Sequence, residues 1–127
     1  MGMISKDNRQ IKLYYNSETS IGRQILPFVE ASEKKVLTID ISTTKVTGTQ
    51  WLEIADHLKM SISELVNVNH PDFVKNYGNK AMNLNEHDWL KLIETHPIII
   101  NYPIVIHGNN FMQIKSPSDL AKYLDKE

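Results

Sequence analysis

Apolar residues in this chain recur with two different spacings, and each spacing predicts a different element. Segments 11–15 (IKLYY) and 36–41 (VLTIDI) are rich in β-branched and aromatic residues, which is typical of strands. Between them, one face of a predicted helix carries Ile21, Ile25, Phe28 and Val29. A strand, a helix and a strand within about thirty residues form a crossover unit, so the two strands are expected to be parallel. Pro27 has no N–H to donate, which predicts a kink or an early end of the helix there.

The middle of the chain has helical spacing. One helix is expected from Thr49 to about Lys59, because its apolar residues recur every three or four positions. Ser61 and Glu64 fit a capping box, which predicts a short helix to about residue 66. A helical turn over 72–77 is expected to end at Gly78, and a clearer helix is expected over 85–94. This third of the chain is therefore predicted to be a helical insert, about 49–95.

The last third predicts a hairpin and a final helix. Segments 104–106 and 111–114 flank the turn residues Gly108, Asn109 and Asn110, as an antiparallel hairpin requires. Ser116 offers an N-cap and Pro117 suits the first helical position. The whole order is that of an α/β fold similar to a thioredoxin-like (glutaredoxin-like) domain. Such a domain has a mixed four-stranded sheet with flanking helices and, here, an inserted helical lobe.

Length and charge narrow the class of protein. With 127 residues, the chain is expected to form a single domain over 11–127, preceded by a flexible N-terminus, residues 1–10. A formal net charge of -1 without a lysine or arginine run argues against general nucleic-acid binding and against a membrane surface. No apolar stretch is long enough to span a bilayer, and residues 1–10 do not form a signal-peptide core. We therefore expect a cytoplasmic protein.

Cysteine is absent from the whole sequence. This removes disulfides, thiolate metal ligands, cysteine nucleophiles and dithiol exchange from the possible chemistry.

Three motifs resemble those of one family. The loop after the first strand, residues 16–23 (NSETSIGR), resembles the N-P-x-C-x-x-x-R loop of glutaredoxin-linked arsenate reductases and of the transcriptional regulator Spx. Residues 96–106 (HPIIINYPIVI) resemble the family segment h-P-x-L-x-x-R-P-I-V, whose second proline is cis. Pro103 stands at that position, and the sequence leaves the Tyr102–Pro103 isomer open. Residues 115–118 (KSPS) are similar to the G-R-P-P-E region before the last helix. The resemblance implies a thioredoxin-like domain of the arsenate reductase (ArsC)/Spx type.

The departures from the family fall on the residues that its chemistry requires. In the family, a cysteine of low pKa at a helix N-terminus attacks arsenate while arginines bind the oxyanion. In this chain Thr19 stands at the position of the cysteine. Asn67, Tyr102 and Lys115 stand about where the resemblance implies the three arginines. A threonine hydroxyl has a pKa far above neutral, so we expect no thiol reductase activity and assign no catalytic residue.

Two functional hypotheses remain open. The first is a non-catalytic binding or regulatory module with an unknown protein partner. The second is a protein that binds a small anion or glutathione, with residual or unrecognised oxidoreductase activity. Both use the same candidate ligand-binding residues, which are Asn16, Ser17, Thr19, Ser20, Arg23, Asn67, Tyr102, Pro103 and Lys115. The serines and threonine among them would also serve simply to cap a helix.

No cofactor and no metal are expected. The chain has no glycine-rich nucleotide fingerprint, and its five histidines show no tight ligand spacing. Glu18, Glu30 and Asp40 are expected near the same end of the sheet, but no pair of them is spaced for acid and base roles.

Overall fold

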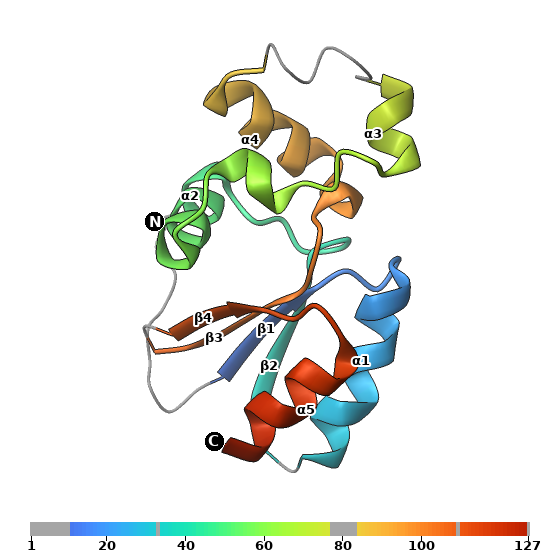
Figure 1. The fold of residues 1–127 in the computed structure, drawn as a ribbon, viewed down its shortest axis with the longest axis vertical. Coiled ribbons are helices and arrows are strands. Elements are labelled where there is room, and N and C mark those ends of the chain that lie inside the picture. The colour runs from blue at the N-terminus through green and yellow to red at the C-terminus, as the bar shows by residue number, and fades with distance from the viewer. Residues whose placement is uncertain (1–10, 33, 77–83, 109, 127) are drawn as a thin grey trace. The chain divides into compact units, whose positions relative to one another are not determined.

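The computed structural model describes residues 11–32, 34–76, 84–108 and 110–126 (Figure 1). They fall into two compact units. The helical unit is Lys45–Asn101, which contains the predicted insert, and the sheet unit combines residues 11–44 with residues 102–126. The expected flexible N-terminus, residues 1–10, lies outside the described residues. The expectation of a single domain stays a prediction.

The sheet unit is built on four strands in the order β2-β1-β3-β4 (Figure 1). β1 and β2 are parallel, whereas β3 runs antiparallel to both β1 and β4. The strands are β1 Ile11–Tyr15, β2 Val36–Asp40, β3 Ile104–His107 and β4 Asn110–Gln113. The mixed four-stranded sheet is confirmed, with strand ends within one residue of the predicted positions.

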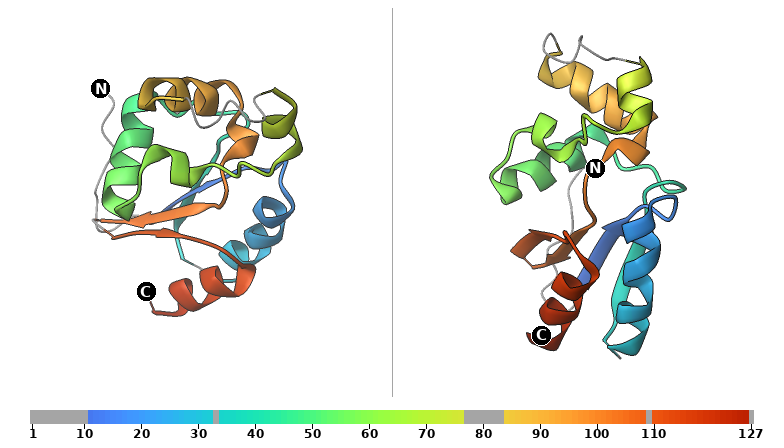
Figure 2. Two further views of the ribbon diagram at one scale, coloured as in Figure 1. Left: turned by 45° about the horizontal axis from the view of Figure 1, so that its top comes forward. Right: turned by 45° about the vertical axis from the view of Figure 1, so that its right-hand side comes forward.

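Two helices cover one face of this sheet, α1 (Ser20–Ala31) and α5 (Pro117–Lys126) (Figure 2). Their apolar faces meet the strand side chains in one buried cluster. It consists of Ile11, Leu13, Ile25, Val29, Val105, Ile114, Leu120 and Leu124. Burying one such side chain contributes about 1.5–3 kcal/mol, so this cluster is the main force that holds the strands and both helices together.

Pro27 does not end α1, which continues to Ala31, so the predicted early end is wrong. The proline removes the hydrogen bond that the carbonyl of Arg23 would have accepted. Arg23 and Pro27 both lie on the exposed face of the helix, where water can bind that carbonyl. Ile25 and Val29, on either side of the proline, anchor the helix in the core. Their burial outweighs the lost backbone bond.

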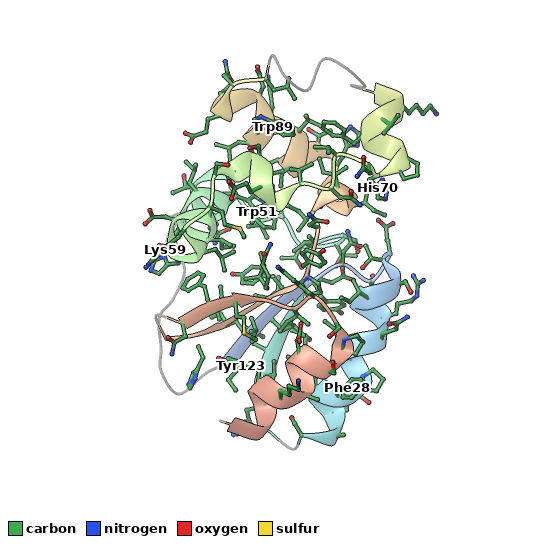
Figure 3. All side chains as sticks on the ribbon, viewed as in Figure 1. Phe28, Trp51, Lys59, His70, Trp89 and Tyr123 are labelled. Atoms are coloured by element: carbon green, nitrogen blue, oxygen red, sulfur yellow. The ribbon has the colours of Figure 1, made fainter. Side chains whose placement is uncertain are left out.

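Among the described residues, the helical unit contains five short elements around its own core, of which α2, α3 and α4 are labelled in Figure 1. They are α2 (Gly48–Leu58), the 3-10 turn η1 (Ile62–Leu65), α3 (Pro71–Asn76), α4 (Glu86–Thr95) and the 3-10 turn η3 (Pro97–Ile99). Trp51 is 2% exposed in this core, and Trp89 stacks on Phe73 with ring centroids 5.6 Å apart (Figure 3). The predicted end of the third helix at Gly78 lies outside the described residues. Within them, no helix is long and apolar enough to cross a membrane.

Two predicted helix starts need correction. α2 begins before Thr49, because Thr47 is the N-cap and forms a capping box with Gln50. The capping box predicted at Ser61 is not formed, since its hydroxyl lies 3.1 Å from that of Ser63 instead. The segment after Ser61 is a single 3-10 turn, in which the amide of Glu64 donates to the backbone carbonyl of Ser61 at 3.1 Å and not to its side chain.

Lys59 ends α2 in the left-handed conformation, with φ 60° and ψ 44° (Figure 3). This conformation is strained for a residue with a Cβ and unstrained for glycine. We expect Lys59→Gly to raise the free energy of unfolding by about 1 kcal/mol, measured by urea denaturation. Lys91→Gly, on the exposed side of α4, is the matched control and should lower it by about 1 kcal/mol. Equal effects of the two substitutions would contradict the assignment of strain to Lys59.

Candidate functional site

Most of the expected site residues lie at one end of the sheet unit. Tyr14 pairs with Ile104 across β1 and β3, so two positions further outward lie Asn16, after β1, and Tyr102, before β3. On the other side of β3, the amide of Ile114 donates to the carbonyl of Pro103 at 2.8 Å. Continuing this register places Lys115 beside Tyr102. The antiparallel pairing therefore brings residues 16, 102, 103 and 115 to the same end of the sheet.

Thr19 is the N-cap of α1, and its hydroxyl makes two hydrogen bonds. It donates to the carbonyl of Asn16 at 2.7 Å and accepts from the amide of Gly22 at 3.0 Å. The amide of Thr19 also donates to the Asn16 carbonyl, at 3.0 Å. The single proton of the hydroxyl is thus used inside the loop, so the hydroxyl has no proton to donate to a ligand.

Gly22 is required by this loop. A Cβ at position 22 would collide with the carbonyl of Asn16 and come within 2.7 Å of the Thr19 hydroxyl. Both atoms belong to the cap, so neither can move aside without breaking it. The sequence analysis did not identify Gly22 as a site residue. Glycine is a poor helix former, so its presence three residues after an N-cap was a usable signal.

The carboxylate of Asp40 is hydrogen-bonded to the loop. Oδ1 of Asp40, at the end of β2, accepts from the amide of Ser17 at 3.2 Å, the amide of Ser42 at 3.0 Å and the hydroxyl of Ser42 at 2.7 Å. Burial acts to raise the pKa of Asp40, but the hydrogen bonds from Ser17 and Ser42 outweigh it and hold that pKa below its usual value. Burial, reinforced by the charge of Asp40, raises the pKa of Tyr15.

The loop therefore satisfies most of its own amides. The amide of Ser17 donates to Asp40, and the amides of Glu18 and Thr19 donate to Asn16. The amide of Gly22 donates to the Thr19 hydroxyl. An anion at the N-terminus of α1 could not use these four amides without displacing their acceptors. It would also meet the negative charge of Asp40 nearby.

Two features of the loop still offer donors. Arg23 places Nη1 3.1 Å from the carbonyl of Ser17 and is otherwise exposed. Asn16 is 6% exposed, and its Oδ1 accepts from the amide of Glu18 at 2.8 Å. Its Nδ2 is buried and has no hydrogen-bond partner among the described residues. An unsatisfied buried amide nitrogen is costly, so this atom is a specific place to expect a bound acceptor.

The other residues at this end of the sheet are Tyr102, Pro103 and Lys115. The ammonium of Lys115 lies 5.9 Å from the centre of the Tyr102 ring, within the range of a cation–π contact. No peptide bond between described residues is cis, so the Tyr102–Pro103 bond is trans. Here the structure departs from the cis proline that the family resemblance implies.

The remaining two candidates have local roles. The hydroxyl of Ser20 accepts from Nε2 of Gln24 at 3.0 Å, one turn along α1. Asn67 belongs to the helical unit, where its amide donates to the carbonyl of Ile99 at 2.8 Å and its side chain accepts from the amide of Asn69 at 3.1 Å. The described residues also contain no group of three or more histidine, aspartate or glutamate side chains that could hold a metal ion.

The charge of Asp40 should stabilise the protein in a pH-dependent way. Because its pKa is lowered in the folded state, this stabilisation is present above the unfolded pKa and is lost as the pH falls through the folded one. We expect Asp40→Asn to lower the free energy of unfolding by about 1 kcal/mol at pH 7. The difference from wild type should shrink below about pH 4.

Urea denaturation between pH 2.5 and pH 7 measures this difference. Asp56→Asn, at an exposed position on α2, is the matched control and should change stability by less than about 0.5 kcal/mol. A cost of Asp40→Asn that stays constant down to pH 2.5 would show that the charge is not what Ser17 and Ser42 bind.

No protein-family model matches the sequence, and no curated protein does. Solved structures do match. An arsenate reductase from Vibrio cholerae superposes with a TM-score of 0.76 over 91% of this chain and 98% of its own, at 15% sequence identity. An arsenate reductase (ArsC) related protein from Brucella melitensis gives a TM-score of 0.68 over 90% and 93%, at 12% identity. The chain therefore has the thioredoxin-like fold found in arsenate reductases of the ArsC family, built without a cysteine.

Proposed function

We propose that this protein is a cysteine-less relative of the arsenate reductases that does not act as a thiol reductase and serves as a binding or regulatory module. The proposal rests on the hydrogen bonds that the Thr19 hydroxyl makes. Its hydroxyl is the N-cap of α1, with its proton on the Asn16 carbonyl and a lone pair on the Gly22 amide. No cysteine elsewhere in the chain can replace it.

The chemistry explains why this matters. Reduction of arsenate through a thiol requires a sulfur atom that attacks the oxyanion and is then oxidised to a disulfide. A threonine oxygen can do neither, because it is protonated at neutral pH and forms no stable bond equivalent to a disulfide. Among the described residues no general base is hydrogen-bonded to the Thr19 hydroxyl, which donates to a backbone carbonyl instead.

The proposal includes a protein partner, in keeping with the resemblance to the regulator Spx, and a cytoplasmic location. The proposed contact surface is this end of the sheet, with Thr19, Arg23, Tyr102 and Lys115. Pro103, which belongs to the same set of candidate residues, is buried. Arg23 and Lys115 give this surface positive charge, and Tyr102 adds a half-buried ring.

A second candidate function is the binding of a small oxyanion or of glutathione at the same edge. The buried Nδ2 of Asn16, which has no partner among the described residues, favours it. Against it stand the satisfied loop amides and the charge of Asp40. We place it second because most donors that would hold an anion already have acceptors.

The absence of thiol chemistry is directly testable. We expect the purified protein to form no arsenite from arsenate with glutathione and glutaredoxin. The substitution Thr19→Cys should produce a reactive thiol with a pKa below the usual value of about 8.5, because the α1 N-terminus and the Gly22 amide favour a thiolate. The pH dependence of iodoacetamide alkylation measures this pKa.

Lys91→Cys, at an exposed position in the middle of α4, is the matched control and should show an ordinary thiol pKa. Arsenite production by the wild type would refute the proposal. A Thr19→Cys pKa equal to that of the control would instead show that the α1 N-terminus does not act on position 19.

Calorimetry separates the two candidate functions. We expect no heat and no change in melting temperature when phosphate, arsenate or glutathione is added to millimolar concentration. Asn16→Asp, which exchanges the Nδ2 donor for an acceptor, is the control for any signal that does appear. Binding that Asn16→Asp abolishes while the fold is retained would establish the second candidate in place of the first.

A further inference from the structure

β2 is the outermost strand of the sheet, and β1 is its only neighbouring strand among the described residues (Figure 2). The amide of Ile41 donates to the carbonyl of Tyr15 at 2.8 Å, so Ile41 turns its backbone groups toward β1. Backbone groups alternate in direction along a strand, which gives Ile39 and Leu37 the same orientation as Ile41. The N–H and C=O groups of Val36 and Thr38 therefore point out of the sheet.

The middle of this edge also carries an exposed apolar side chain. Leu37 is 45% exposed, and it lies on the opposite face of β2 from Val36, which packs against the core of the sheet unit. An edge strand with outward backbone groups and a central leucine is a template for another strand. Lysines often protect such edges, and Lys34 and Lys35 stand directly before β2.

We propose that β2 pairs with β2 of a second copy of this chain, antiparallel and centred on Leu37. In this register Val36 lies opposite Thr38 of the second copy, and symmetry repeats the pair, so four backbone hydrogen bonds form. Leu37 faces Leu37 of the second copy on the same side of the joined sheet. Each leucine covers the other, which removes apolar area from water on both copies.

The carbonyl of Asp40 selects this register. Centring the pair on Thr38 would place Asp40 opposite Val36 and require its carbonyl to accept a further amide. That carbonyl already accepts from the amides of Thr43 at 3.1 Å and Thr44 at 2.8 Å, which fills its two lone pairs. In the register centred on Leu37, Asp40 lies opposite Lys34, whose amide already donates to the hydroxyl of Ser32, so the pairing uses only the backbone groups of Val36 and Thr38.

Charge favours the same register. Lys34 comes to lie opposite Asp40 of the second copy, and Lys35 lies opposite Ile39. A shift that centred the pair on Lys35 would set two lysines against each other. The pairing involves only one short strand from each copy, so we expect weak association, with a dissociation constant on the order of 100 µM.

Because the chain has no cysteine, a single introduced cysteine supplies the only thiol that can form a disulfide between two copies. In the proposed register the two Leu37 positions form a non-hydrogen-bonded pair, with Cα atoms about 4.5 Å apart, within the range of a disulfide. Leu37→Cys should oxidise to a covalent dimer at least tenfold faster than the matched control Lys35→Cys. The control thiols lie four residues apart along the paired strands.

Sedimentation equilibrium between 10 µM and 1 mM tests the association without oxidation. The wild type should move from monomer toward dimer over this range, and Leu37→Lys should remain monomeric. Phe28→Lys, on the exposed face of α1, should associate as the wild type does. A monomeric wild type at 1 mM, association of Leu37→Lys equal to wild type, or equal oxidation of the two cysteine variants would each overturn the proposal.

Discussion

The loop at the start of α1 depends on the carbonyl of Asn16, which accepts both the amide and the hydroxyl of Thr19. These two bonds turn the chain sharply out of β1 and into the helix. They also bring the amide of Gly22 onto the Thr19 hydroxyl, at a separation that only glycine permits. The Thr19 hydroxyl therefore has a structural role as the cap of α1, and its proton and one lone pair are used inside the loop.

The second constraint is electrostatic. A helix N-terminus ordinarily attracts an anion through its free amides and the helix dipole. In this protein the Asp40 carboxylate is bonded to the loop before that N-terminus through the amide of Ser17, and also to Ser42. Its lowered pKa keeps it charged at neutral pH. The loop thus carries a negative charge of its own on the Ser17 amide, which disfavours an oxyanion at that amide.

The sequence predicted those parts of the fold that local spacing determines. The hairpin was predictable because Gly108, at φ 62°, sits between two apolar segments, and the crossover was predictable from two strands around one amphipathic helix. The Asp40 network was not, since Ser17 and Ser42 are 25 residues apart and meet only because β1 and β2 pair in parallel. Thr47 was missed as a cap because Gly48, a weak helix former, obscured where α2 begins.

The family resemblance pointed to the loop over residues 16–23, but it compared residues one position at a time. Thr19, which stands where the resemblance implies a cysteine, is only one of the residues that shape this loop. Restoring a thiol at position 19 would leave the amides of Ser17 and Glu18 on their present acceptors and would leave the Asp40 charge in place. We therefore expect a single cysteine at position 19 to add a reactive thiol without freeing the amides of Ser17 and Glu18 for an oxyanion.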